Sequence, residues 1–368
     1  MGKFYHMIES ARKLLLTVIA CFGIYAFANA QILKVVVAGL NHDHAHTIMR
    51  QFKEGKVVIL GIAESNPVLV ERYKKSYQVP DSLFFTSLKQ ILDRKKPDAV
   101  LAFNAIVDHE AVVEECAPRG ISVMVEKPLA TTVRAAEKMA ALARRYHILL
   151  LTNYETTWYK TNHEIYDLVY SRDQIGAIRK MVVHDGHQGP KEIGCSPEFL
   201  SWLTDPVKNG GGAVMDFGCY GANLMTWLMG GKAPVSVMAI TKQIKPDIYP
   251  KVDDDATIVL GYENATGIIE ASWNWPYGIK DIEVFGKKGY LHGLNGNDLV
   301  QKADTGTYRP APVGELKYRD NLIYLAAALK GEVKEANDLS SLENNLIVVH
   351  ILEAAKESAK TGRTVLLK

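Results

Sequence analysis

From residue 32 to about residue 152, short apolar runs alternate with stretches that carry polar residues on one side. Each run is rich in Val, Ile and Leu and is bounded by helix or turn signals, which is typical of a strand buried on both faces. Strands that alternate with helices predict βαβ units and a parallel sheet. The predicted strands are residues 32–40, 57–63, 98–103, 121–125 and 148–152, and the predicted helices are residues 44–54, 67–77, 87–94, 108–117 and 132–146.

After residue 153 the pattern changes, because helices no longer separate the strands. The strand-like segments carry Val, Ile and Trp and are bounded by turn signals such as Lys287-Lys288-Gly289. Consecutive strands joined by turns predict a mostly antiparallel sheet. Three glycines at residues 210–212 interrupt these strands and precede a predicted helix from Asp216 to about Met229. The predicted strands are residues 180–187, 235–244, 256–262, 266–275 and 281–285, and the other helices are residues 162–171, 321–329 and 341–360.

The first thirty residues have the features of a secretory signal peptide. Basic residues precede an apolar segment at residues 14–27, and Ala28-Asn29-Ala30 is a small-x-small cleavage signal. The apolar segment is too short to span a membrane. Acylation of Cys21 in a lipoprotein signal is the alternative, but the apolar run continues past Cys21. We therefore expect cleavage after Ala30 and a periplasmic or otherwise exported protein without a transmembrane span in the mature chain.

Composition and charge exclude several classes of function. Of the 368 residues, 48% are hydrophobic, and we find no repeat or low-complexity tract, so the chain is globular. Without residues 1–30, which hold three basic and one acidic residue, 40 Lys and Arg balance 40 Asp and Glu. This balance gives no indication of nucleic-acid or anionic-membrane binding. Cys116, Cys195 and Cys219 are odd in number and match no zinc spacing, so no disulfide framework is expected.

The first predicted strand ends where a dinucleotide-binding fold carries the motif G-x-G-x-x-G. Gly39 is the first glycine, but Asn41 and His44 replace the second and third. A phosphate can still bind at the following helix N-terminus, helped by Asn41 and His42. Glu64 ends the second strand, where a carboxylate binds ribose hydroxyls and repels a 2′-phosphate, which favours NAD over NADP. The alternative is that Glu64 is an ordinary solvated residue at a strand end.

Two histidine clusters are candidate ligand sites. His42, Asp43, His44 and His46 are all metal-ligand types, but residues 44 and 46 do not face each other on a helix, so we expect no metal site.

The second cluster is His184, Asp185 and His187 in the antiparallel half. Residues 185 and 187 share one face of a strand. We expect His184 and His187 to contact a sugar.

Glu126-Lys127-Pro128 follows the fourth strand, residues 121–125. In an open parallel sheet, ligands bind outside the carboxyl ends of the strands. The charged pair is therefore a candidate for catalysis, and a strand-end salt bridge followed by a proline turn is the alternative.

A second candidate motif runs from the three glycines to Asp216 and Tyr220. These two residues are four apart, so we expect them to share one helix face. A carboxylate and a phenol near a lysine are able to transfer a proton, because an ammonium lowers the pKa of the tyrosine. The alternative is a helix cap beside a core tyrosine.

In combination and order, these motifs resemble the Gfo/Idh/MocA oxidoreductases from about residue 32 to the C-terminus. The resemblance implies an α/β fold: a Rossmann NAD-binding domain at residues 31–154, then an α+β domain with a mostly antiparallel open sheet at residues 155–368. It also implies a nicotinamide cofactor and usually a sugar or cyclitol substrate. The motifs that carry it are Glu126-Lys127-Pro128, the three glycines with Asp216-x-Gly218-x-Tyr220, Asp281-Ile-Glu-Val-Phe-Gly286, and the end Glu357-Ser358-Ala-Lys-Thr361-Gly362-Arg363.

The resemblance also implies roles for individual residues. Lys127 falls on the catalytic lysine of the family, Asp216 on its aspartate and Tyr220 on its acid–base residue, where most members carry histidine. The chain departs from the family at positions 41 and 44 and at Phe103-Asn104-Ala105, where members usually read Thr-Pro-Asn. The expected cofactor-binding residues are Gly39, Asn41, His42, Glu64, Asn104, Glu126 and Lys127, and the expected substrate-binding residues are Lys127, His184, His187, Asp216 and Tyr220.

We therefore expect a periplasmic NAD-dependent oxidoreductase that acts on a sugar or sugar derivative. The alternative is a glycosidase or lyase that keeps NAD bound and oxidises a sugar hydroxyl transiently, with no net redox change. A binding protein that has lost its cofactor is a third possibility, against which the intact Lys127, Asp216 and Tyr220 argue. The expected partners are a carbohydrate and, through the C-terminal sheet, further copies of the chain.

Overall fold

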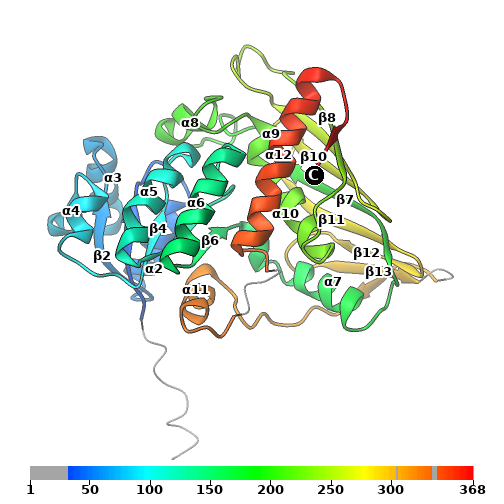
Figure 1. Cartoon of the computed structure of the whole chain (residues 1–368), viewed down its shortest axis with the longest axis horizontal. Coiled ribbons are helices and arrows are strands. Elements are labelled where there is room, and N and C mark those ends of the chain that lie inside the picture. Colours follow the sequence, from blue (N-terminus) through cyan, green and yellow to red (C-terminus); the bar gives the residue numbers. More distant parts are fainter. Residues whose placement is uncertain (1–31, 304–305, 334–337, 368) are drawn as a thin grey trace, which may run out of the picture. The chain divides into compact units, whose positions relative to one another are not determined.

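The computed structural model describes residues 32–303, 306–333 and 338–367. From Lys34 on, these residues form one compact unit that contains two sheets (Figure 1). The signal-peptide and Cys21 predictions fall on residues 1–30, outside the described residues. In the part of the chain that the structure describes, none of the helices combines the length and apolar character that a membrane crossing needs.

The first sheet is parallel, in the order β3-β2-β1-β4-β5-β6. Its central strands are buried on both faces, as the apolar runs predicted. Asn66, Ser87 and Thr132 each precede a helix, and their side chains cap its first turn. The strands are β1 Lys34–Ala38, β2 Val58–Ala63, β3 Phe84–Phe85, β4 Ala99–Ala102, β5 Ser122–Glu126 and β6 Leu150–Asn153, and the helices are α2 Ala45–Lys53, α3 Pro67–Tyr77, α4 Leu88–Leu92, α5 His109–Cys116 and α6 Val133–Tyr146, with short 3-10 turns at Asp81–Leu83, Ile106–Asp108, Ala117–Arg119 and Glu155–Trp158.

The second sheet has the order β14-β13-β12-β11-β7-β10-β9-β8-β15. Every pairing in it is antiparallel except that between β10 and β7. This confirms the predicted fold class. The strands are β7 Ile178–Gly186, β8 Ser236–Lys242, β9 Asp255–Gly261, β10 Thr266–Ser272, β11 Ile279–Gly286, β12 Gly289–Gly293, β13 Leu299–Ala303, β14 Arg309–Ala311 and β15 Val365–Leu366, and the helices are α7 Lys160–Tyr170, α8 Pro197–Leu203, α9 Ala213–Asp216, α10 Gly218–Leu228, α11 Asn321–Leu329 and α12 Leu342–Thr361.

Helices α10 and α12 cover one face of the second sheet, and α12 also packs against α6 of the first half (Figure 1). Leu346 and Val349 of α12 belong to the apolar core of the first sheet. Ile351 and Leu352 belong to the core of the second. The last helix is therefore shared by both cores, and the predicted boundary near residue 154 stays a prediction.

The prediction of one helix that begins at Asp216 is wrong. Asp216 ends α9, and α10 begins at Gly218 after a break at Phe217. Asp216 therefore caps no helix, and it does not share a continuous helix face with Tyr220. The short elements α8, β3 and β12–β15 were not predicted, because they lack a long apolar period.

Candidate active site

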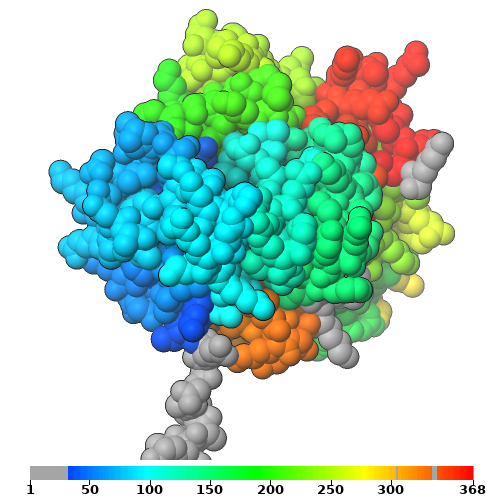
Figure 2. Space-filling model, turned by 60° about the vertical axis from the view of Figure 1, so that its left-hand side comes forward, coloured from blue at the N-terminus to red at the C-terminus, as the bar shows by residue number. Residues whose placement is uncertain are grey.

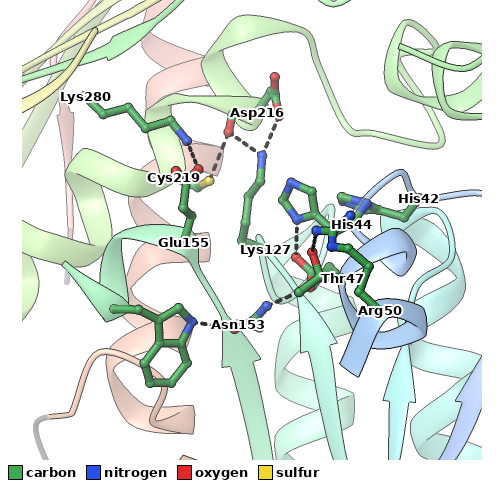
Figure 3. Close-up of polar contacts among 12 residues, drawn as sticks. His42, His44, Thr47, Arg50, Lys127, Asn153, Glu155, Asp216, Cys219 and Lys280 are labelled. Atoms are coloured by element: carbon green, nitrogen blue, oxygen red, sulfur yellow. Dashed lines mark hydrogen bonds and ion pairs between the residues drawn. The ribbon is translucent and has the colours of Figure 1, made fainter. Parts of the chain in front are cut away.

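Lys127 follows the last residue of β5, at the carboxyl edge of the first sheet, and its peptide bond to Pro128 is cis. Its buried ammonium donates to Asp216 Oδ1 at 2.5 Å and to the main-chain oxygen of Asp216 at 2.9 Å (Figure 3). Burial by itself lowers the pKa of Lys127, but the carboxylate of Asp216 outweighs it and raises the pKa above its usual value. Lys127 therefore stays charged at neutral pH.

Asp216 is buried and has partners for both carboxylate oxygens. Lys127 binds one oxygen, and Trp273 Nε1 donates to the other at 3.0 Å. Burial by itself raises the pKa of Asp216, but the charge of Lys127 and these hydrogen bonds lower it below its usual value. The carboxylate is therefore ionised and fixed in position.

The glycines before Asp216 form a tight loop around Asp253. The carboxylate of Asp253 accepts the main-chain N–H groups of Gly212 at 2.8 Å and Val214 at 2.7 Å. A Cβ atom at Gly212 would lie 1.7 Å from the carbonyl oxygen of Asp253. Only glycine fits at this position, so the loop that places Asp216 depends on it.

Tyr220 lies in the same buried site, 1% exposed. The ammonium of Lys127 is 4.9 Å from the centre of its ring, and the edge of Tyr154 packs against it. The expectation that a lysine lowers the pKa of Tyr220 is wrong. Burial raises that pKa well above its usual value, and the negative charges of Glu155 and Asp185 raise it further. Tyr220 is therefore a protonated phenol in this state.

Lys280 of β11 is a site residue that the sequence analysis missed. Its ammonium is 4.4 Å from the centre of the Tyr220 ring. Figure 3 shows its contact with Glu155, whose Oε2 is 2.5 Å away. The strand was predicted to begin at Asp281, two residues after its actual start at Ile279. The sequence did contain a signal for this residue. Every second residue of a strand faces the same side, so Lys280 shares the inner face of β11 with the buried residues Ile282 and Val284.

The structure separates the residues of the second histidine cluster. Asp185 and His187 are near the site: Asp185 is opposite Lys280 across the β7–β11 pairing, and the His187 ring packs on Phe217 at 4.8 Å. Burial raises the pKa of Asp185 and lowers that of His187. His184 points to the opposite face of the sheet, as strand alternation requires.

On that outer face, His184 Nδ1 is 2.6 Å from Asp281 Oδ1, and His292 contacts the other oxygen of the same carboxylate. The hydrogen bond and the charge of Asp281 raise the pKa of His184, which fits a structural ion pair. His184 is therefore not among the residues that the structure gathers around Lys127.

The loop at residues 39–44, which lacks two of the expected glycines, begins with the geometry of a dinucleotide-binding loop. Gly39 has φ +80°, and a Cβ there would lie 2.7 Å from Asn104 Cβ. Glu64 accepts the N–H groups of Leu40 at 2.9 Å and Asn66 at 2.7 Å, which fixes its carboxylate beside the loop. Within the described part of the chain, the buried Oδ1 atoms of Asn41 and Asn104 have no hydrogen-bond partner. These acceptors fit the hydroxyl groups of a bound nucleotide.

His42, His44 and Glu126 lie together at the end of this loop, with ligand atoms within 4.8 Å of one another. Their contacts are already internal. His44 Nδ1 is 2.8 Å from Glu126 Oε2, and the N–H of His44 donates to His42 Nδ1. A metal would have to displace both hydrogen bonds, so the absence of a metal stays our prediction.

A cavity of about 330 Å³ opens at the carboxyl ends of β4, β5 and β6. On its far side, Gln51 Nε2 donates to Asn321 Oδ1 of α11, and Figure 2 shows α11, in orange, lying against the first half. Phe103 and Trp158 supply flat apolar walls, and amide side chains supply donors and acceptors. Such a lining fits a nicotinamide ring with its carboxamide. The lining residues include His44, Gln51, Phe103, Glu126, Asn153, Glu155, Trp158 and Asn321.

Comparison with known proteins agrees with this geometry. A model of the oxidoreductase family with an NAD-binding Rossmann fold matches residues 33–154, and a model of the GFO/IDH/MocA C-terminal domain matches residues 168–292. Together they cover more than half of the chain. The protein is therefore an NAD-binding oxidoreductase. It belongs to the Gfo/Idh/MocA family, which confirms the resemblance drawn from the motifs.

Individual relatives are distant. Trans-1,2-dihydrobenzene-1,2-diol dehydrogenase of Sus scrofa is 21% identical over 341 residues, which are 88% of this chain and 95% of that protein. The aldose-aldose oxidoreductase of Caulobacter crescentus, solved with glycerol, has a TM-score of 0.77 at 23% identity, covering 92% of this chain and 100% of that one. An inositol dehydrogenase homolog of Azotobacter vinelandii, solved with NAD⁺, has a TM-score of 0.77 at 16% identity, covering 92% and 98%.

Proposed function

We propose that this protein is an exported oxidoreductase that acts on a sugar or sugar derivative with a tightly held NAD. The observation that carries the proposal is the buried convergence of Lys127, Asp216 and Tyr220 next to a cavity that fits a nicotinamide. The relative from Caulobacter crescentus is named for aldoses, which supports a sugar as the substrate class.

In this proposal, each residue has a separate task. Glu64, Asn41 and Asn104 hold the nucleotide by its hydroxyl groups, and Glu126 lies at the nicotinamide end. NAD supplies the acceptor for a hydride. Lys127 binds the substrate hydroxyl with its ammonium, and Asp216 keeps that ammonium in place.

Tyr220 exchanges the hydroxyl proton at its phenolic oxygen as the C–H bond is broken. The hydroxyl becomes a carbonyl, its proton passes to the phenolate form of Tyr220, and the hydride leaves the same carbon. In the reverse direction the phenol returns the proton.

A redox-neutral glycosidase or lyase is the second candidate, because the same buried Lys127, Asp216 and Tyr220 can serve an oxidation and its reversal. Oxidation of a ring hydroxyl acidifies the neighbouring C–H bond, which permits elimination of the glycosidic substituent. The carbonyl is then reduced again, with Tyr220 as the proton donor. A residue that rests as a phenol is prepared for this last step.

The compartment is part of the same proposal. Arg12-Lys13 is not a twin-arginine pair, so we infer export through the Sec route. A Sec substrate crosses the membrane unfolded and cannot carry NAD with it. No obvious pool outside the inner membrane sustains turnover of a dissociable NAD, so a retained and self-regenerating cofactor fits best.

Assembly through the second sheet is likewise proposed. On β8, Val237 and Ala239 are buried on the helix-covered face, whereas Met238 and Ile240 are 46% and 57% exposed on the other. Apolar side chains on an open sheet face favour contact with a further copy of the chain.

The proposed function is tested by the cofactor that the protein carries. We expect the mature protein, purified from its native compartment, to hold NAD through dialysis and to convert a glycoside or sugar pair without net reduction of added NAD. Mass spectrometry of the released cofactor is expected to give NAD rather than NADP, because Glu64 repels a 2′-phosphate. Steady stoichiometric NADH formation would restore a simple dehydrogenase, and full activity without any cofactor would overturn both.

Contacts from α8 supply a physical reason for tight retention. We call residues 196–203 the clasp. Ser196 donates to the carboxylate of Asp43 through its N–H at 2.9 Å and its hydroxyl at 2.6 Å, and Trp202 Nε1 donates to the carbonyl of Asn41 at 3.0 Å. The clasp thus binds the loop that accepts the dinucleotide phosphates in this fold.

A bidentate ion pair joins the clasp to α3: Arg72 donates to both oxygens of Glu198, each at 2.8 Å. We expect Glu198→Arg to speed NAD release about tenfold, because it replaces this pair by a repulsion. The double variant Arg72→Glu/Glu198→Arg is expected to restore slow release. Release is measured from the fluorescence of bound NADH after dilution.

The control reverses the exposed pair Arg144–Glu343, which joins α6 to α12 away from the loop. Its reversal is expected to leave the release rate unchanged. Equal release rates for the wild type and Glu198→Arg would remove the clasp from the explanation of retention.

A further inference from the structure

Two ammonium groups, rather than one, lie over the ring of Tyr220. Lys127 approaches to 4.9 Å and Lys280 to 4.4 Å from the ring centre. Lys127 is neutralised by Asp216 at 2.5 Å, and Lys280 by Glu155 at the same distance. The two lysines come from different sheets, so the fold places two ion pairs around one phenol.

The electrostatics of the site explain why a second cation is needed. Burial holds Tyr220 in its neutral form, and the surrounding carboxylates oppose a phenolate. A cation over a desolvated aromatic ring stabilises negative charge on that ring. The ionisable groups that face Tyr220 are Lys127 after β5, Tyr154 and Glu155 after β6, Asp185 on β7, Asp216 on α9, Cys219 on α10 and Lys280 on β11.

Glu155 lies between the partly buried Lys280 and water. Its side chain is 50% exposed and lines the cavity at the strand ends, while the Lys280 side chain is 21% exposed. Tyr159 also donates to Glu155, at 2.9 Å. Glu155 therefore holds Lys280 over the ring and has access to solvent at the same time.

We propose that Lys280 is a positioning residue of the reaction: its ammonium stabilises the phenolate of Tyr220, and Glu155 holds it there. This inference rests on the proposed function. Lys280 is not one of the three residues, Lys127, Asp216 and Tyr220, to which the family resemblance gives a role. In the oxidative step the phenol first gives its proton to solvent. The phenolate then accepts the proton of the substrate hydroxyl, the substrate O–H bond breaks, and the hydride leaves the same carbon.

The test compares Lys280→Met with the wild type. We expect kcat/KM at pH 7 to fall roughly tenfold to thirtyfold, and the rise of oxidative activity with pH to move to higher pH, because less phenolate forms without the cation. Lys280→Arg keeps the charge and is expected to recover most of the activity. In Lys280→Met/Glu155→Gln both charges are absent, which separates loss of the cation from the cost of an unpaired carboxylate.

A readout without turnover keeps the inference separate from the proposed function. With tyrosines labelled with carbon-13 at Cζ, and with the Tyr220 signal assigned from Tyr220→Phe, we expect ionisation of Tyr220 to begin at higher pH in Lys280→Met than in the wild type. The control is Lys302→Met. Lys302 lies on β13, and its ammonium is 5.0 Å from the centre of a different ring, that of Tyr308. An unmoved Tyr220 signal overturns the role of Lys280, whether or not a sugar is turned over.

Discussion

Lys127→Ala and Tyr220→Phe are each expected to lower kcat/KM by about a hundredfold to ten-thousandfold, the range of a lost acid–base group. Lys127 places a charge at the substrate hydroxyl, and Tyr220 exchanges its proton. Steady-state kinetics with a sugar that the wild type converts measures the effect. Neither ring contact nor burial of Tyr220 requires its hydroxyl, so Tyr220→Phe is expected to fold normally.

Lys127→Ala needs a control for folding, because it leaves Asp216 buried without its cation. The double variant Lys127→Met/Asp216→Asn removes both charges and is expected to be folded and equally inactive. Lys138→Ala, which removes an exposed ammonium on α6, is expected to keep full activity. Rates near the wild type for Lys127→Ala and Tyr220→Phe would show that the site lies elsewhere.

Among the Gly→Ala substitutions in the glycine loop, Gly212→Ala is expected to destabilise the protein most. The new Cβ would lie 1.7 Å from the carbonyl oxygen of Asp253, so the backbone has to move. We expect the free energy of unfolding to fall by at least about 3 kcal/mol and activity to be lost, since the same loop carries Asp216. Denaturant titration measures the first effect and kinetics the second.

Gly278→Ala is the matched control, because a Cβ at that position meets nothing within 4 Å. Its unfolding free energy is expected to stay within about 0.5 kcal/mol of the wild type. If Gly212→Ala were as stable as Gly278→Ala, the loop would not depend on contact with Asp253.

The sequence predicted the two sheets because their residues follow two different periods. Continuous apolar runs such as that before Gly39 require a sheet covered on both faces. Lys127 was found because it follows such a run, and Asp216 and Tyr220 because glycines mark a tight loop before them. These are local signals, and local signals are what a single sequence contains.

The remaining features of the site depend on pairings that a single sequence does not contain. The contact between Lys280 and Glu155 joins residues 125 positions apart, and it exists only once β11 lies beside β7. The direction of the Tyr220 pKa was predicted wrongly for the same reason, since the burial that raises it comes from tertiary packing. His184 was nominated although strand alternation turns it away from Asp185 and His187.

The shared helix α12 has a consequence for how such proteins are recombined. Leu346 and Val349 complete the core of the first half, although they lie almost two hundred residues beyond its last strand, β6. A fragment that ends near residue 154 exposes the surface they cover, on the side of α6. A chimera that exchanges the cofactor half between relatives therefore has to take these positions of the last helix along with it.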